Sequence, residues 1–125
     1  MLLDRAQESL RAAELCLEAE LVNSAASRAY YAMFQAAQVA LEAAGAARDQ
    51  WSHAAIQAAF TSELIRRSKV YPASLSDHLS VGLRVRRIAD YGGAGVSWKV
   101  ADRLVRRASA FLSIVQAGTR RASNR

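Results

Sequence analysis

The sequence predicts an all-α protein, an up-and-down bundle of four main helices with one additional short helix. Apolar residues recur at the three- and four-residue spacing of one helix face, and no segment alternates with the two-residue period of a half-buried strand. Much of the 52% hydrophobic content of the 125 residues is alanine, which favours helices over sheets. A chain of this length predicts one domain, which we place at residues 1–118, followed by a basic, frayed tail at 119–125.

The first two helices are separated by a short polar turn. Apolar side chains follow one face of residues 2–20, as an amphipathic helix requires. Asn23 or Ser24 can then cap a second helix, which runs to Gly45 as a natural C-terminal stop. This second helix is apolar nearly all round. Such a helix belongs at the centre of a bundle or at a subunit interface.

Three further helices follow. Ser52 can cap a helix that runs from His53 to about Ser68. The next segment, 69–76, is expected to be a loop because the residue before its proline is pushed out of the helical region. A serine at its end, Ser74 or Ser76, starts the fourth helix, which stops at the glycines at 92, 93 and 95. The fifth helix is capped by Ser97 and is expected to end at Gly118.

The net charge of +6 is divided unevenly between the two halves of the chain. Residues 1–62 hold four basic and seven acidic side chains, whereas residues 63–125 hold thirteen basic and four acidic ones. Fifteen of the seventeen basic residues are arginine, which binds phosphate in a bidentate fork. The second half therefore predicts an acidic partner, RNA or a nucleotide.

Several functional classes are excluded by composition. No run approaches the roughly 18 apolar residues of a membrane span, and the N-terminus carries acids where a signal peptide carries basic residues. We expect a soluble, cytoplasmic protein without membrane contact. Cys16, the single cysteine, lies in a helical pattern and is expected to be a buried apolar residue. With two histidines and no close pairing among them, we expect no metal site and no cofactor.

Three motifs stand in a fixed order along the chain. They are SRAYYAMFQAAQVALEAAG from Ser27, HAAIQAAF from His53, and RRIADY from Arg86. Together with ASAFL from Ala108, they resemble the HEPN superfamily, the higher eukaryotes and prokaryotes nucleotide-binding domains. The resemblance is to the small stand-alone bacterial and archaeal branch, and it covers about residues 3–116.

The resemblance implies a helical bundle that dimerises, often encoded beside a minimal nucleotidyltransferase with which it forms a toxin–antitoxin pair. Active members are metal-independent ribonucleases that carry an arginine and a histidine separated by four to six residues, with the two copies of the motif meeting at a dimer cleft. Here the positions after Arg86 hold Tyr91, Gly92 and Gly93 instead. Histidine transfers protons near neutral pH, whereas tyrosine, with a pKa near 10, is a poor base.

The first hypothesis is therefore a dimeric HEPN protein that binds nucleotide or RNA at Arg86 and Tyr91 and is not itself an enzyme. It would act as the toxin-like partner of a nucleotidyltransferase, with Tyr91 as a conceivable target of nucleotidylation. The alternative is a metal-independent ribonuclease that uses Arg86 with Tyr91 or His53. A third option is a non-catalytic helical scaffold, without salt-dependent affinity for RNA.

Other polar residues complete the expected site. Arg87 and Asp90 belong to the same helix end, although Arg86 and Asp90 are four residues apart and can simply pair. Arg28 lies inside an apolar helix and, if buried, needs a carboxylate or phosphate partner. His78 lies about two turns before Arg86, too far along one helix to act on the same phosphate unless a partner subunit supplies it.

One further arginine group has two interpretations. The last helix carries basic residues at three- and four-residue spacing, Arg103, Arg106 and Arg107. This stripe is either a solvated helix face or a surface that contacts a nucleic-acid backbone.

Overall fold

The computed structural model describes residues 2–123, in which five α-helices and one π-helical segment occur without a strand. The elements are α1 (Leu2–Glu18), α2 (Val22–Ala43), α3 (His53–Ala59), η1 (Phe60–Arg67), α4 (Ser74–Tyr91) and α5 (Trp98–Ser123). Four long helices form the bundle, and α3 with η1 makes one shorter helical arm. The predicted all-α bundle with an additional short helix is confirmed.

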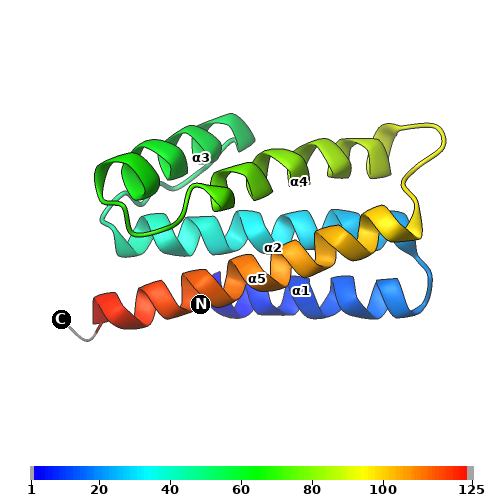
Figure 1. Cartoon of the computed structure of the whole chain (residues 1–125), viewed down its shortest axis with the longest axis horizontal. Coiled ribbons are helices and arrows are strands. Elements are labelled where there is room, and N and C mark those ends of the chain that lie inside the picture. The colour runs from blue at the N-terminus through cyan, green and yellow to red at the C-terminus, as the bar shows by residue number, and fades with distance from the viewer. Residues whose placement is uncertain (1, 124–125) are drawn as a thin grey trace.

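Helix α2 is the centre of the bundle. It packs against α1, α4 and α5 and also contacts α3 and η1. In Figure 1, α2 lies in the middle of the view with α5 in front of it, α1 below, and α3 and α4 above. The even distribution of apolar side chains around α2 explains this position, because every side of the helix meets another element. The central placement of the second helix is as the sequence indicated.

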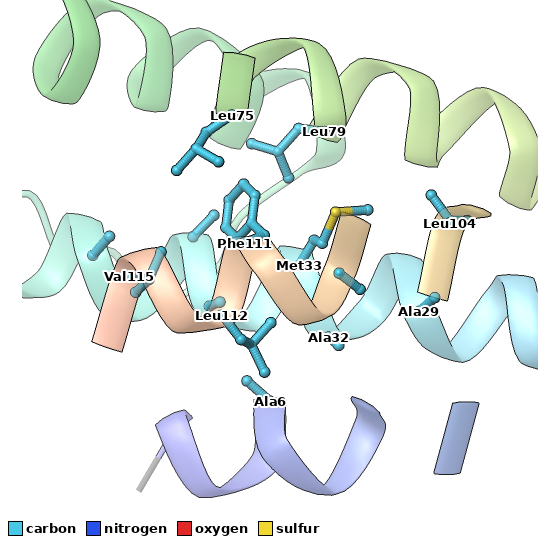
Figure 2. Close-up of a cluster of buried hydrophobic side chains, with 14 of the residues drawn as sticks. Ala6, Ala29, Ala32, Met33, Leu75, Leu79, Leu104, Phe111, Leu112 and Val115 are labelled. Carbon is cyan, nitrogen blue, oxygen red and sulfur yellow. The ribbon is translucent and has the colours of Figure 1, made fainter. Parts of the chain in front are cut away.

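The core is built from small residues on α2 and larger ones on its neighbours. Figure 2 shows Phe111 and Leu104 of α5 and Leu79 of α4 converging on Met33, with short alanine side chains along α2. The buried alanines of α2 are Ala25, Ala26, Ala29, Ala32, Ala36, Ala37 and Ala40. Because alanine adds little bulk, the helix axes approach closely, and each large buried side chain contributes about 1.5–3 kcal/mol.

A glycine brings α4 close to α2. Gly82 is buried, and a Cβ atom there would lie 2.6 Å from Met33 Cε and 3.1 Å from Tyr30 Cδ1. A Cβ atom there would require the end of the Met33 side chain to shift and would crowd the Tyr30 ring. Gly82 therefore allows α4 to pack closely against α2 one turn before Arg86.

The start of α2 differs from the prediction. The helix begins at Val22 without a side-chain cap, so the expected capping role of Asn23 or Ser24 is wrong. Asn23 Oδ1 instead accepts a hydrogen bond of 2.9 Å from the backbone N–H of Val96. The side-chain amide of Asn23 therefore holds the 92–97 loop against α2. At the other end, Gly45 adopts a φ of +82°, which confirms it as the C-terminal stop.

The middle elements begin where the sequence predicted. Ser52 Oγ accepts the N–H of Ala55 at 3.0 Å and caps α3, and α4 begins at Ser74, the first of the two expected starts. The helix expected to continue to Ser68 changes at Phe60 into the π-helix η1, which the apolar pattern did not indicate. Periodicity over eight residues is too short to distinguish a π-helix from an α-helix.

Helix α5 has the predicted start and a different end. Ser97 Oγ accepts the N–H of Val100 at 3.2 Å, as expected of a cap, and Trp98, the first helical residue, is 49% exposed. The helix continues past Gly118 to Ser123, so the predicted stop is wrong. Gly118 is buried against Tyr71, and a Cβ atom at this position would lie 2.7 Å from Tyr71 Cε1. The remaining residues of the expected tail, 124 and 125, lie outside the described residues.

Candidate functional site

Arg86 is held between α2 and α4. Its side chain is 15% exposed, and its Nη2 donates a hydrogen bond of 3.0 Å to the hydroxyl of Tyr31 on α2. Its Nε lies 2.9 Å from Asp90 Oδ2, an ion pair whose geometry gives Nε no hydrogen bond. The expected pairing of Arg86 with Asp90 is confirmed. A guanidinium fixed from two sides is already oriented before any ligand arrives.

Two aromatic rings flank this guanidinium. Arg86 Cζ lies 5.1 Å from the ring centre of Tyr31 and 5.9 Å from that of Tyr91. Both distances are within the range of a cation–π attraction. The positive charge therefore links a half-buried ring on α2 to an exposed ring at the end of α4.

Tyr91 stands at the mouth of an open cavity. The residue is 78% exposed, although large aromatic residues are usually more buried, and Gly92 follows it where α4 ends. The adjoining cavity has a volume of about 450 Å³ and lies between α2 and α4. We call it the Tyr91 cavity; its lining residues are Asn23, Ser24, Ser27, Arg28, Ala89, Asp90 and Tyr91. This combination offers a flat ring, hydroxyl and amide groups, and a positive charge.

Charge at the Tyr91 cavity comes from both helices. Arg28 is exposed, and an exposed arginine does not require the carboxylate or phosphate partner that a buried one would need. Its Cζ lies 5.7 Å from the Tyr31 ring centre. Ser27 Oγ donates to Asp90 Oδ2 at 3.4 Å, which adds to the hold on that carboxylate. Arg87 is exposed beside Arg86 on α4. Within residues 2–123, neither Arg28 nor Arg87 forms an ion pair.

His53 joins the same group of side chains from α3. Its Nδ1 lies 2.7 Å from the hydroxyl of Tyr30, and its ring centre is 5.1 Å from that of Phe34. Burial, and then the positive charges of Arg86 and Arg87, lower the pKa of His53 below its usual 6.5. The imidazole is therefore neutral at pH 7. The structure thus brings His53 to the neighbourhood of Arg86.

Tyr30 separates His53 from the core. Burial raises the pKa of the Tyr30 hydroxyl to about 12, although the charge of Arg86 acts in the opposite direction. The hydroxyl therefore keeps its proton at every physiological pH. Because a hydroxyl both donates and accepts, it can orient either tautomer of His53.

His78 lies outside this group. Burial, and then the positive charge of Arg107 on α5, lower the pKa of His78. Its Nδ1 is buried and has no hydrogen bond within the part of the chain that the structure describes. His78 therefore faces α5, in agreement with the expectation that it does not serve the Arg86 site.

A second arginine and aromatic pair occurs on the connection between α2 and α3. Arg48 Cζ lies 4.6 Å from the ring centre of Trp51, beside another cavity of about 450 Å³. We call it the Trp51 cavity; it is lined by Ala46, Ala47, Arg48, Trp51, Ala55, Ala58, Ala59, Ser62 and Glu63. Arg48 is exposed and, among the described residues, has no other polar contact. It was not singled out by the sequence.

Two further findings concern metal-binding groups and membrane spans in residues 2–123. No group of three or more histidine, cysteine or acidic side chains is arranged to hold a metal ion in this part of the chain. None of the helices described is long and apolar enough to cross a membrane. Cys16, expected to be buried, is partly buried on α1 and packs against the core.

The sequence identified the charged members of the site and missed its aromatic support. Arg86, Asp90, Tyr91 and Arg28 do gather at one place, whereas Tyr31 was not among the expected site residues. A signal was present, because a tyrosine in an apolar helix must still find a partner for its hydroxyl. To identify that partner as Arg86, one must know which side of α2 faces α4, and the sequence alone does not give this orientation.

Comparison with known proteins gives one family and one relative. A sequence model of the HEPN domain matches residues 1–118. A UPF0332 protein of Gloeobacter violaceus is 32% identical over 115 residues, which cover 90% of this chain and 89% of the relative.

Proposed function

The chain belongs to the HEPN family, and we propose that it binds a nucleotide or RNA in the Tyr91 cavity. The observation that carries the proposal is the exposed ring of Tyr91, which lines a cavity together with hydroxyl, amide and arginine side chains and lies 5.9 Å from Arg86 Cζ. A base can stack on this ring, an interaction of about 1–3 kcal/mol in single-strand binding proteins.

The phosphate group is held by arginines in this proposal. A guanidinium has five N–H donors; Arg86 uses one for Tyr31 and turns another toward Asp90, which leaves three for a ligand. Asp90 compensates the charge of Arg86. Arg28 on the rim of the cavity therefore supplies the net positive charge, and Arg87 adds to it from α4.

The binding proposal can be tested with a short oligouridine in a filter-binding titration at two salt concentrations. We expect Tyr91→Ala to weaken binding by about tenfold or more, because a stacking partner is lost. Trp51→Ala is the matched control, since it removes an aromatic side chain from a cavity of similar volume. Equal affinity of the two variants would refute the Tyr91 site, and an absence of salt-dependent affinity in the unmodified protein would favour the scaffold interpretation.

We further propose that the protein acts as a dimer and as the toxin-like partner of a minimal nucleotidyltransferase. The support is the family resemblance together with a tyrosine where ribonucleases of the family carry histidine. The exposure of Tyr91 would also allow its hydroxyl to accept a nucleotide. Co-expression with a neighbouring nucleotidyltransferase, followed by intact mass measurement, tests this step. A mass increase that persists in Tyr91→Phe would exclude Tyr91 as the acceptor.

A second candidate function is metal-independent RNA cleavage. The observation that favours it is the position of His53, a neutral imidazole that shares the aromatic group around Arg86. If Nδ1 donates its hydrogen bond to Tyr30, Nε2 is free to accept the proton of the ribose 2′-hydroxyl, whose oxygen attacks the phosphate held by Arg86. The bond between phosphorus and the 5′-oxygen then breaks, and the leaving 5′-oxygen takes a proton from water. Cleavage in the presence of EDTA that disappears in both Arg86→Ala and His53→Ala would support it. Equal activity of Arg86→Ala and the unmodified protein would end this idea.

A further inference from the structure

The acidic residues of the second half are mostly occupied by ion pairs. Of the four in residues 63–125, three lie within 3.1 Å of an arginine on the same helix, one turn away. These pairs are Glu63 with Arg67, Asp90 with Arg86, and Asp102 with Arg106. The remaining basic side chains therefore keep an uncompensated positive charge.

The basic stripe on α5 is divided by these pairs. Arg106 is bound to Asp102 at 3.1 Å. Arg103 and Arg107, in contrast, have no ion pair within residues 2–123. Their four-residue spacing places both on the same side of α5, about 6 Å apart along the axis. The stripe therefore contains two arginines without an ion pair among the described residues, Arg103 and Arg107, and one, Arg106, whose charge is neutralised by Asp102.

Arg107 is partly buried on the side of α5 toward α4, and Arg103 is exposed one turn away on the same helix. Arg107 is near enough to His78 of α4 for its charge to lower the pKa of that histidine. Arg103 stands one turn closer to the start of α5 and so on the same flank. Helices α4 and α5 pack beside each other and are joined by the 92–97 loop. We call this surface, with His78, Arg103 and Arg107, the α4–α5 flank.

The α4–α5 flank begins at the end of the bundle that carries the Tyr91 cavity. Helix α4 ends at Tyr91, and α5 starts at Trp98 close to that end and then crosses in front of α2 in the opposite direction, as Figure 1 shows. A strand that leaves the cavity along this flank would meet Arg103 first and Arg107 second. The spacing of these arginines is comparable with that of neighbouring phosphates in an extended strand.

We propose that the α4–α5 flank binds the phosphate backbone of single-stranded RNA, with Arg103 and Arg107 as its contacts. The inference rests on the proposed function and specifies its ligand as an oligonucleotide that extends beyond the Tyr91 cavity, rather than a mononucleotide. A single strand fits because its bases are free to stack on an exposed aromatic ring, whereas bases in a duplex are not.

The test compares two ligands and two double variants of the full chain. The ligands are a radiolabelled dodecauridylate, titrated by filter binding between 50 and 200 mM salt, and uridine monophosphate, titrated by calorimetry. The test variant is Arg103→Gln with Arg107→Gln. The control is Arg106→Gln with Arg11→Gln, which removes the same number of positive charges; Arg106 is paired, and Arg11 is exposed on α1, which makes no contact with α4.

We expect the test variant to bind the dodecauridylate about tenfold more weakly at the lower salt concentration. The slope of log affinity against log salt should become shallower by about 1.4, since each lost phosphate contact removes roughly 0.7. The control should keep the slope of the unmodified protein within about 0.3. The affinity for uridine monophosphate should stay unchanged in both variants.

The outcomes separate this inference from the proposed function. Equal slopes in the test variant and the control would overturn the flank, even if Tyr91→Ala weakens both ligands and the cavity stands. An equal loss for the dodecauridylate and uridine monophosphate would also overturn it, because the flank would then not be specific to the longer ligand. RNA binding that depends on Arg103 and Arg107 but not on Tyr91 would support the flank as a backbone site and refute the cavity.

Discussion

The Tyr91 and Trp51 cavities are alike in size and differ in how their arginine is held. Each is about 450 Å³ and is lined by an aromatic ring that has an arginine close to it. Arg48 itself lines the Trp51 cavity, whereas Arg86 lies beside the Tyr91 ring and is not one of the lining residues. Arg86 has three kinds of support, from a tyrosine hydroxyl, a carboxylate and two rings, and its side chain is 15% exposed. Arg48 has the Trp51 ring alone among the described residues and lies in an irregular connection.

The difference between Arg86 and Arg48 shows how the rigidity of an arginine side chain affects its suitability for binding a ligand. A cation that must lose side-chain freedom on binding pays an entropic cost, whereas one already fixed by helices does not. Arg86 is fixed by α2 and α4, which Gly82 holds close together. Arg48 keeps its freedom, so the Trp51 cavity has the composition of a site without its rigidity.

The largest difference between the two cavities should appear in stability. We expect Arg86→Met to lower the free energy of unfolding by about 2 kcal/mol, because the hydrogen bond to Tyr31 and the Asp90 ion pair are both lost. Arg48→Met should lower it by less than about 0.5 kcal/mol, since an exposed side chain is changed. Urea denaturation followed by circular dichroism measures both. Equal effects would show that the contacts of Arg86 do not stabilise the fold.

A smaller effect should separate the hydroxyl of Tyr31 from its ring. Tyr31→Phe keeps the ring under Arg86 and removes the acceptor of its Nη2, so we expect a loss of about 1 kcal/mol in the same denaturation experiment. Tyr91→Phe is the control, because the Tyr91 hydroxyl has no hydrogen bond within residues 2–123. A loss as large in the control would mean that the hydrogen bond to Arg86 is not the cause.

The smallest effect concerns the titration of His53. Its pKa is lowered in the folded protein, so protonation is easier in the unfolded chain; stability is full above pH 6.5 and falls as the pH drops below it. His78 acts in the same direction. An NMR titration, with His78→Gln to assign the two histidines, should find the His53 pKa below 6.5.

The same titration extends the comparison of the two arginines. The pKa of His53 should rise in Arg86→Met and remain below 6.5, because burial is the larger cause and Arg87 is still present. It should not move in Arg48→Met. A shift of the same size in both variants would indicate that the charge of Arg86 is not felt at His53.

The sequence predicted the helices well because each depends on local chemistry. Ser52 and Ser97 cap their helices as expected, and the apolar surround of α2 correctly placed it at the centre. The errors occur where a distant residue intervenes. Asn23 bonds to Val96 instead of capping α2, and Gly118 makes room for Tyr71 instead of ending α5.

The site was predicted in part for the same reason. Arg86, Asp90 and Tyr91 are neighbours on one helix, so their proximity followed from the chain itself. The hydrogen bond between Arg86 and Tyr31 joins residues 55 positions apart, and its existence depends on how α4 is rotated against α2. No local pattern specifies that rotation, which packing around Gly82 determines.

The two tryptophans of the chain lie near different cavities. Trp51 lies at one cavity, and Trp98 follows the 92–97 loop, whose Val96 is bonded to Asn23 at the other. Replacing either one with phenylalanine leaves a single tryptophan, whose emission can be excited selectively over that of the four tyrosines. The emission of Trp98 alone would report what happens at the Tyr91 end of the bundle, and that of Trp51 alone would serve as a built-in reference on the same molecule.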